Sequence, residues 1–187
     1  MWSSRDIACI IVMSVLTLVA TLLVIQVAGM LTNIPGANYS STVFLAMLNT
    51  ISLLLFEGRR WRFFAEFSLF TLLSLPTYLG GAPFFVQGRI HFFLTAFLAD
   101  LILNSFYKKS IESNKLKWWS ILGALSFWLM FPFFSLLIRP LFFSLEFVAT
   151  LANVIFLMLP VIIVESLAGG YLGYRIFLRL ERNRLAH

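Results

Sequence analysis

One short stretch of this chain, GGAPFFVQGRIHFF at residues 80–93, gathers residue types that bind small molecules. Gln87, Arg89 and His91 lie close together there, although 60% of the 187 residues are hydrophobic and only 12% are charged. A guanidinium holds anionic or carbonyl oxygens, and an amide or an imidazole orients a polar ring. The glycines and the proline before them predict a break between two helices. We therefore expect these three side chains to reach a cavity.

The elements that must position these residues are membrane spans. A soluble domain of this length is about half apolar and a quarter charged, so the composition predicts an all-α integral membrane protein. Pro76, Pro132 and Pro160 fall inside the apolar runs and are expected to kink the helices. We expect a single domain, residues 1–187, with six transmembrane helices at about 7–31, 41–56, 63–79, 90–107, 118–138 and 147–174.

The basic residues indicate how the spans are oriented. Twelve of the fourteen lysines and arginines flank the spans on one side, and only Arg89 and Arg139 lie on the other. Cytoplasmic loops carry the excess of basic residues, so both termini are predicted to be cytoplasmic in a multi-pass protein of the cell membrane. Residues 80–93 then face outside. Because the basic residues bracket apolar runs and form no single patch, we expect no nucleic-acid partner.

The outer side carries the candidate substrate site. The first outer loop, TNIPGANYSST, is rich in hydrogen-bonding groups. Mostly apolar walls with a few polar groups are typical of a small-molecule pocket. The alternative is that loops at an interface are polar in any case and that Arg89 meets lipid phosphate. The candidate substrate-binding residues are Asn33, Asn38, Tyr39, Gln87, Arg89, His91, Trp128 and Asn153, with Trp128 stacking on the substrate.

Three acidic residues lie inside predicted spans, where a charge is costly. Glu66 follows Arg62 by four residues, so we expect a contact between them along one helix face. Asp100 must hydrogen-bond or pair within the bundle. Glu165 is expected to accept donors that the kink at Pro160 releases. A structural role is the simpler interpretation for all three.

The signatures of common enzymes are absent from this sequence. It has no GxxxxGK[ST] loop, so ATP-driven work would need separate subunits, and it has neither HExxH nor GxSxG. His91 and His187 fall on opposite sides of the membrane in the predicted topology and cannot share a site. We expect no enzyme activity, no metal and no cofactor.

Three segments resemble the substrate-binding S components of energy-coupling factor (ECF) vitamin transporters. NIPGANYSSTVFLAMLNTISLLLFEGRRW is similar to their loop after the first helix, with a small-residue span and a basic hairpin behind it. GGAPFFVQGRIHFFLTAFLADLIL is similar to their glycine-rich break before a fourth span with an Ala-Asp pair. VESLAGGYLGYRIFLRLER is similar to their usual ending, and the resemblance covers most of the chain.

The resemblance implies an S-component-like bundle that captures a vitamin-like molecule from outside. It also implies docking on a transmembrane coupling subunit with two separate ATP-binding subunits. The family docks through alanines four apart in the first helix, and the nearest match here is Ser4 and Ala8. Gly169 and Gly173, also four apart, form a small face that lets a helix approach closely, either within the fold or from a partner. We assign these four residues to partner docking.

The leading hypothesis is therefore a substrate-capture subunit of an ECF-type importer in the lipid membrane. The alternative is a structural or scaffolding protein of the cell envelope that binds no small molecule. The partners that copurify with the chain separate the two, because only the importer needs an ATPase-bearing module.

Overall fold

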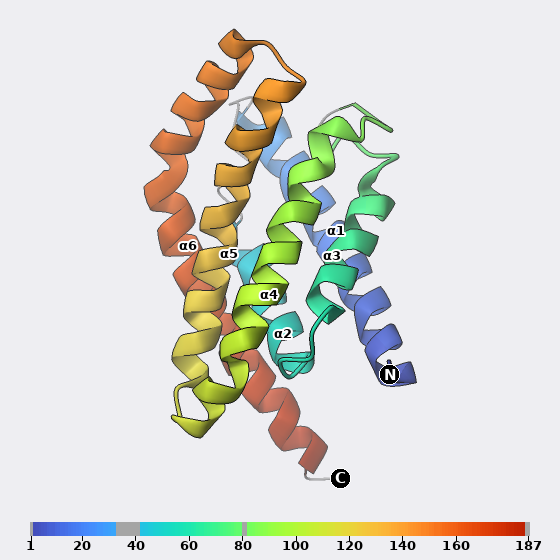
Figure 1. The fold of residues 1–187 in the computed structure, drawn as a ribbon, viewed down its shortest axis with the longest axis vertical. Helices are drawn as coiled ribbons and strands as arrows, with labels where there is room; N and C mark the ends of the chain where they lie inside the picture. The colour runs from blue at the N-terminus through green and yellow to red at the C-terminus, as the bar shows by residue number, and fades with distance from the viewer. Residues whose placement is uncertain (1, 33–41, 80–81, 186–187) are drawn as a thin grey trace.

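The computed structural model describes residues 2–32, 42–79 and 82–185, and all regular secondary structure within them is helical (Figure 1). The 3-10 helix η2, Gln87–Arg89, leads into α4, and η3, Arg139–Leu141, follows α5. The α-helices are α1 Ser4–Thr32, α2 Thr42–Leu55, α3 Arg62–Ser74, α4 Ile90–Glu112, α5 Leu116–Ile138 and α6 Leu145–Leu185.

The helices differ in whether they are long enough to cross a membrane. Helices α2 and α3, with 14 and 13 residues, are each about 20 Å long, against a hydrocarbon core of about 30 Å. The described residues contain four stretches that are long and apolar enough to cross: Ser4–Val24, Gln87–Glu112, Leu116–Leu141 and Leu145–Arg182. The all-helical prediction is confirmed, and crossing by α2 and α3 stays a prediction.

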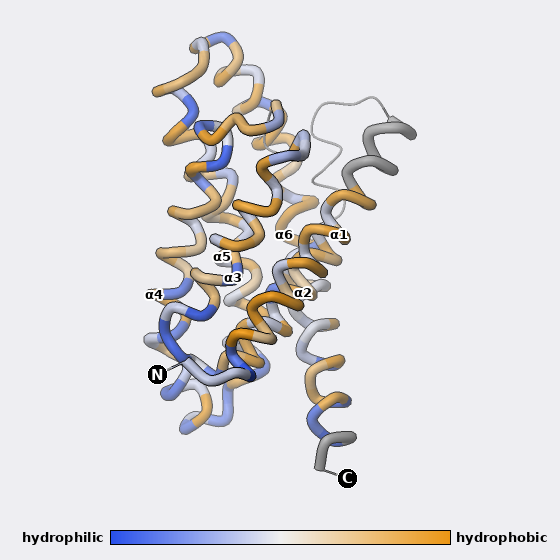
Figure 2. The backbone as a smooth tube through the Cα atoms, turned by 90° about the vertical axis from the view of Figure 1, so that its right-hand side faces the viewer, coloured by the Kyte–Doolittle hydropathy of each residue, from blue (hydrophilic) through white to orange (hydrophobic). Residues whose placement is uncertain are grey.

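The connections place most of the basic residues at one end of the bundle. The start of α1, the end of α6 and the α2–α3 and α4–α5 connections all lie at the lower end in Figure 1. Figure 2 shows hydrophobic residues along most of each long helix, with hydrophilic ones near these lower connections and others at the upper end. Most of the basic residues thus share one end, and which side of a membrane this end faces stays a prediction.

The core forms around α2 and a column of aromatic rings. Helix α2 packs against α6, α5 and α1, while α3 lies between α1 and α4. The ring of Phe127 lies 5.4 Å from that of Phe63 and 4.7 Å from that of Phe67, so α5 and α3 meet through aromatic contacts. Each such pair adds about 0.5–1.5 kcal/mol beyond the burial of its area.

Helix α3 is shorter than predicted because of Pro76. It ends at Ser74, whereas the predicted span continued to residue 79. Leu75 keeps helical dihedral angles, but Pro76 has no N–H to donate, and the amides of Leu75 and Thr77 bond to oxygens three residues back, so the regular helix ends here. Pro76 therefore follows the helix and does not kink it, and the predicted break at Gly80 and Gly81 falls outside the described residues. Pro132 and Pro160, by contrast, lie inside continuous helices.

Asp100 binds the start of α3. Its Oδ1 accepts hydrogen bonds from the Trp61 amide (2.8 Å) and from Asn104 Nδ2 (2.9 Å), and its Oδ2 accepts one from the Phe64 amide (3.0 Å). The first amides of a helix have no partner within it, and a carboxylate there also interacts favourably with the helix dipole. Trp61, just before the helix, has φ 71°, which turns the hairpin toward α4. The expectation that Asp100 hydrogen-bonds within the bundle is confirmed.

Glu165 holds the start of α2, which is not the role predicted for it. Its Oε2 accepts a hydrogen bond from the Val43 amide at 3.2 Å. The sequence predicted donors released by a kink at Pro160, but the unpaired amides of a neighbouring short helix supply the contact instead. Both short helices therefore begin against a carboxylate from a long helix.

Glu66 does not contact Arg62, so that prediction was wrong. Fully buried Glu66 accepts a hydrogen bond from Ser52 Oγ at 2.9 Å, and its main-chain oxygen accepts one from Ser14 Oγ at 2.8 Å. Arg62 turns the other way and lies 3.3 Å from Asp6 Oδ2. Asp6 lies at the start of α1, where Arg59 of the α2–α3 hairpin also reaches it, whereas Glu66 is fully buried in the bundle.

Candidate functional site

Four uncharged polar side chains from four helices lie buried around the upper part of the aromatic column. They are Asn49 of α2, His91 of α4, Trp128 of α5 and Ser166 of α6, and we refer to them as the inner polar site. Their exposed fractions are 0%, 1%, 7% and 0%. Each has at least one hydrogen-bonding atom without a partner in the described part of the chain: Asn49 Oδ1 and Nδ2, His91 Nδ1, Trp128 Nε1 and Ser166 Oγ.

His91 and Trp128 meet at Phe131. The centroid of the Phe131 ring lies 5.0 Å from that of His91 and 5.5 Å from that of Trp128. His91 also packs edge-on against Phe92 at 4.6 Å, and Trp128 against Phe127 at 5.6 Å. Two of the predicted substrate-binding residues are thus brought to one aromatic ring.

Contacts along α6 place Ser166 and Asn49 at different levels, because Glu165 beside Ser166 bonds the Val43 amide, whereas a Cβ on Gly173 would lie 2.8 Å from Thr50 Cβ, next to Asn49. A Cβ on Gly170 would lie 3.2 Å from Ala124, and α5 and α6 run in opposite directions, so one turn further Ser166 faces Trp128. In the same way, a Cβ on Gly123 would lie 3.7 Å from Leu53 of the antiparallel α2. Asn49 precedes Leu53 by one turn of α2 and so lies on the same face of that helix. Asn49 and Ser166 are therefore separated by about two turns along α6, whereas His91 and Trp128 meet at one ring.

Unpaired polar atoms in an apolar interior are costly. A buried donor or acceptor without a partner costs about 1–3 kcal/mol, and native proteins contain few of them. Trp119 illustrates the usual arrangement, because its Nε1 donates to the Leu103 carbonyl at 3.1 Å. A group of such atoms, walled by aromatic rings, has the make-up of a ligand site with a few polar contacts that fix orientation.

Arg89 is placed elsewhere and binds main-chain oxygens. Its Nη1 donates to the carbonyls of Phe85 (2.7 Å) and Ala82 (3.3 Å), and its Nη2 to those of Thr77 (2.7 Å) and Ser74 (3.2 Å). These oxygens belong to the end of α3 and the connection behind it. Arg89 is 0% exposed, so the alternative that it meets lipid phosphate is wrong. Its predicted contact with a substrate stays a prediction.

The other predicted substrate residues are not gathered at the inner polar site. Gln87 and Asn153 are exposed, and within the described residues neither forms a hydrogen bond with His91 or Trp128. Asn33, Asn38 and Tyr39 lie outside the described residues. Asn49 and Ser166 were missed, although Asn49 is an amide in the middle of an apolar run and Ser166 lies beside Glu165.

The predicted docking residues fall into two pairs. Ser4 and Ala8 are exposed on α1, and their role in docking stays a prediction. Gly169 and Gly173 are buried against α2, which corrects their assignment to a partner. A Cβ on Gly169 would meet the Val43 carbonyl and lie 2.8 Å from the Ala46 Cβ, and one on Gly173 would lie 2.6 Å from the Met47 carbonyl. The small face thus serves close packing within the fold.

This packing gives a direct prediction for Gly169→Ala. The added methyl group meets main chain, which cannot move aside, so we expect a loss of about 1–3 kcal/mol in the free energy of unfolding. Gly123→Ala is the matched control, because its nearest neighbour is a leucine methyl at 3.4 Å. Thermal unfolding of both variants in detergent measures the difference, and equal melting temperatures would contradict the close α2–α6 contact.

The described residues together define a class: their regular structure is all helical, four of their helices are long and apolar enough to cross a membrane, and polar side chains are buried beside aromatic rings. No protein-family model, no curated protein and no solved structure matches the chain.

Proposed function

We propose that this chain is the substrate-capture subunit of an ECF-type importer, which binds a small vitamin-like molecule from the outer side of the membrane. Delivery then requires a transmembrane coupling subunit and separate ATP-binding subunits. The observation that carries the proposal is the inner polar site, where His91 and Trp128 meet at Phe131 and further unpaired polar atoms of α2 and α6 are buried in the same bundle. The resemblance of residues 80–103 and 164–182 to S components supports the same function.

The chemistry of the site defines the substrate. Trp128 offers a donor, Asn49 offers both a donor and an acceptor, and Phe127 and Phe131 offer faces and edges for a ring. The four side chains that define the site include no carboxylate, lysine or arginine. The group bound there is therefore flat, ring-bearing and uncharged, with hydrogen-bonding atoms at its edge.

Thermal unfolding with a panel of vitamins and their precursors tests this function. A ligand that binds only the folded protein stabilises it by about 2.7 kcal/mol at one hundred times its Kd. For a chain of this size we expect the melting temperature to rise by roughly 5–10 °C. A panel that includes ring-bearing compounds and produces no shift would contradict the proposal and favour a scaffolding role.

Trp128→Phe separates a ligand contact from a structural one. Its Nε1 has no partner among the described residues, so the substitution removes an unpaired donor, and we expect little loss of stability without ligand. Trp119→Phe is the matched control, because it removes a paired donor, and we expect it to be less stable by about 1–2 kcal/mol. A substrate found in the panel should bind Trp128→Phe about tenfold more weakly and Trp119→Phe with unchanged affinity. If Trp119→Phe weakened substrate binding and Trp128→Phe left it unchanged, Trp128 would not be a substrate contact.

A further inference from the structure

A hollow lies on the surface of the molecule, along one face of α3. It is open to the surface and has a volume of about 480 Å³. The residues of α3 that line it recur every three or four positions, so they form one face of the helix over about 16 Å. The lining residues, which define the α3 groove, are Trp2, Trp61, Phe64, Ala65, Ser68, Leu69 and Leu72.

The lower rim of the α3 groove has the residues of a membrane interface. Trp2 and Trp61 are 47% and 43% exposed, and tryptophan favours the level of the lipid headgroups. The guanidinium of Arg62 lies 5.3 Å from the centre of the Trp2 ring. Above this rim the lining is apolar except for Ser68, whose Oγ has no partner among the residues described. The groove therefore leads from the interface into the hydrocarbon region.

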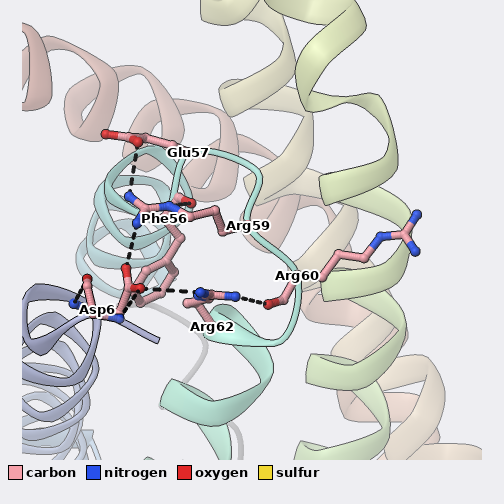
Figure 3. A network of polar contacts seen from close by, with 7 residues as sticks. Asp6, Phe56, Glu57, Arg59, Arg60 and Arg62 are labelled. Atoms are coloured by element: carbon pink, nitrogen blue, oxygen red, sulfur yellow. Dashed lines mark hydrogen bonds and ion pairs between the residues drawn. The ribbon is translucent and has the colours of Figure 1, made fainter. Parts of the chain in front are cut away.

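The charges at the rim are unequal. The α2–α3 hairpin and the start of α1 carry Arg5, Arg59, Arg60 and Arg62 against Asp6 and Glu57, a surplus of two positive charges. Figure 3 shows how the acids are used: Arg59 contacts Asp6 at 2.8 Å and Glu57 at 3.0 Å, and Arg62 contacts Asp6.

Arg60 lies outside this network and points away from Asp6 (Figure 3). It is exposed, and within the described chain its guanidinium has no hydrogen bond or ion pair. Its only role there is that its main-chain oxygen accepts a bond from Arg62 at 2.9 Å.

We propose that the α3 groove and Arg60 bind one anionic phospholipid. An acyl chain lies along Phe64, Ser68 and Leu72, and the phosphate lies at the headgroup level, where Arg60 holds it. The apolar length of the groove matches an acyl chain, and the surplus positive charge at its interfacial end matches an anionic headgroup. A helix of a partner protein would use the apolar face but would leave Arg60 without an anion.

Native mass spectrometry of the purified full chain, with phosphatidylglycerol or phosphatidylcholine added, tests this site. We expect one bound phosphatidylglycerol, about tenfold preferred over phosphatidylcholine. Arg60→Gln should reduce bound phosphatidylglycerol at least fivefold, to the level of phosphatidylcholine. Lys109→Gln, which removes the same charge from an exposed position on α4, is the control and should retain the preference.

Three outcomes would overturn the proposal. The first is an equal effect of Arg60→Gln and Lys109→Gln. The second is competition by glycerol 3-phosphate as strong as that of the whole lipid, since a headgroup alone does not need the groove. The third is a copurifying protein whose removal alone opens the groove to lipid. Ser68→Phe should fill the groove and abolish binding of both lipids. If Ser68→Phe fails to fold, the comparison of Arg60→Gln with Lys109→Gln still tests the site.

Discussion

Asp100→Ala is expected to lower the free energy of unfolding by about 2–6 kcal/mol, because it removes the acceptor that pairs the amides of Trp61 and Phe64 at the start of α3. Each amide left unpaired away from water costs about 1–3 kcal/mol, and the carboxylate that pairs both is itself fully buried. The loss concerns the start of α3, so the hairpin that carries Arg59, Arg60 and Arg62 loses its anchor to α4 as well.

Thermal unfolding in a mild detergent, followed by circular dichroism, measures this effect. Asn104→Ala is the matched control, since it removes only the side-chain bond to Asp100 and leaves both amides paired. Asp100→Asn should fall between the two, because its single oxygen can still accept one amide. A loss below about 1 kcal/mol in Asp100→Ala would show that α3 does not depend on this contact.

Arg89→Ala is expected to be comparably destabilising, by about 3 kcal/mol or more, because four main-chain oxygens lose a charged donor. These oxygens end α3 and shape the connection to α4, and Arg89 is the one charged side chain that the described hydrogen bonds bring to all four. The variant should therefore unfold at a lower temperature whether or not a substrate is present.

The same variant distinguishes a structural arginine from a substrate contact. If Arg89 served mainly to hold a substrate, Arg89→Ala would keep its melting temperature and lose only the shift caused by ligand. Gln87→Ala controls for position, because Gln87 lies in the same 3-10 helix, is exposed and should leave the stability within about 0.5 kcal/mol of the parent. Arg89→Lys is informative too, since one ammonium cannot replace a fork that reaches four oxygens.

Much of the fold could be predicted from the sequence, because the apolar runs are long. The predicted spans 41–56 and 118–138 lie close to α2, Thr42–Leu55, and α5, Leu116–Ile138. The end of α3 was missed because Pro76 was interpreted as a kink in a continuing helix. The last predicted span ended at residue 174, whereas α6 continues to Leu185. Hydropathy indicates where a helix leaves the membrane, and it does not indicate where the helix itself ends.

The site was less predictable, because residue type does not show which partner a polar group finds. An arginine in a predicted outer turn suggested a ligand contact, yet Arg89 meets main-chain carbonyls at the end of α3 and in the connection behind it. Glu66 and Arg62 have the spacing of an ion pair, but a serine on α2 and an aspartate on α1 lie closer in space. Asn49 and Ser166 look like ordinary polar residues in sequence, and only the packing shows that their polar atoms are unpaired.

Helix α6 has a practical consequence for imaging a chain of only 187 residues. It runs for 41 residues without a break, about 61 Å, and its last turns extend beyond the rest of the bundle in Figure 1. A second domain fused in helical continuity with these turns would share the orientation of the bundle. Each residue added at the joint would rotate that domain by about 100° around the helix axis and move it by about 1.5 Å, so a small set of linkers would place it at different angles to the bundle axis and yield a rigid marker for aligning images.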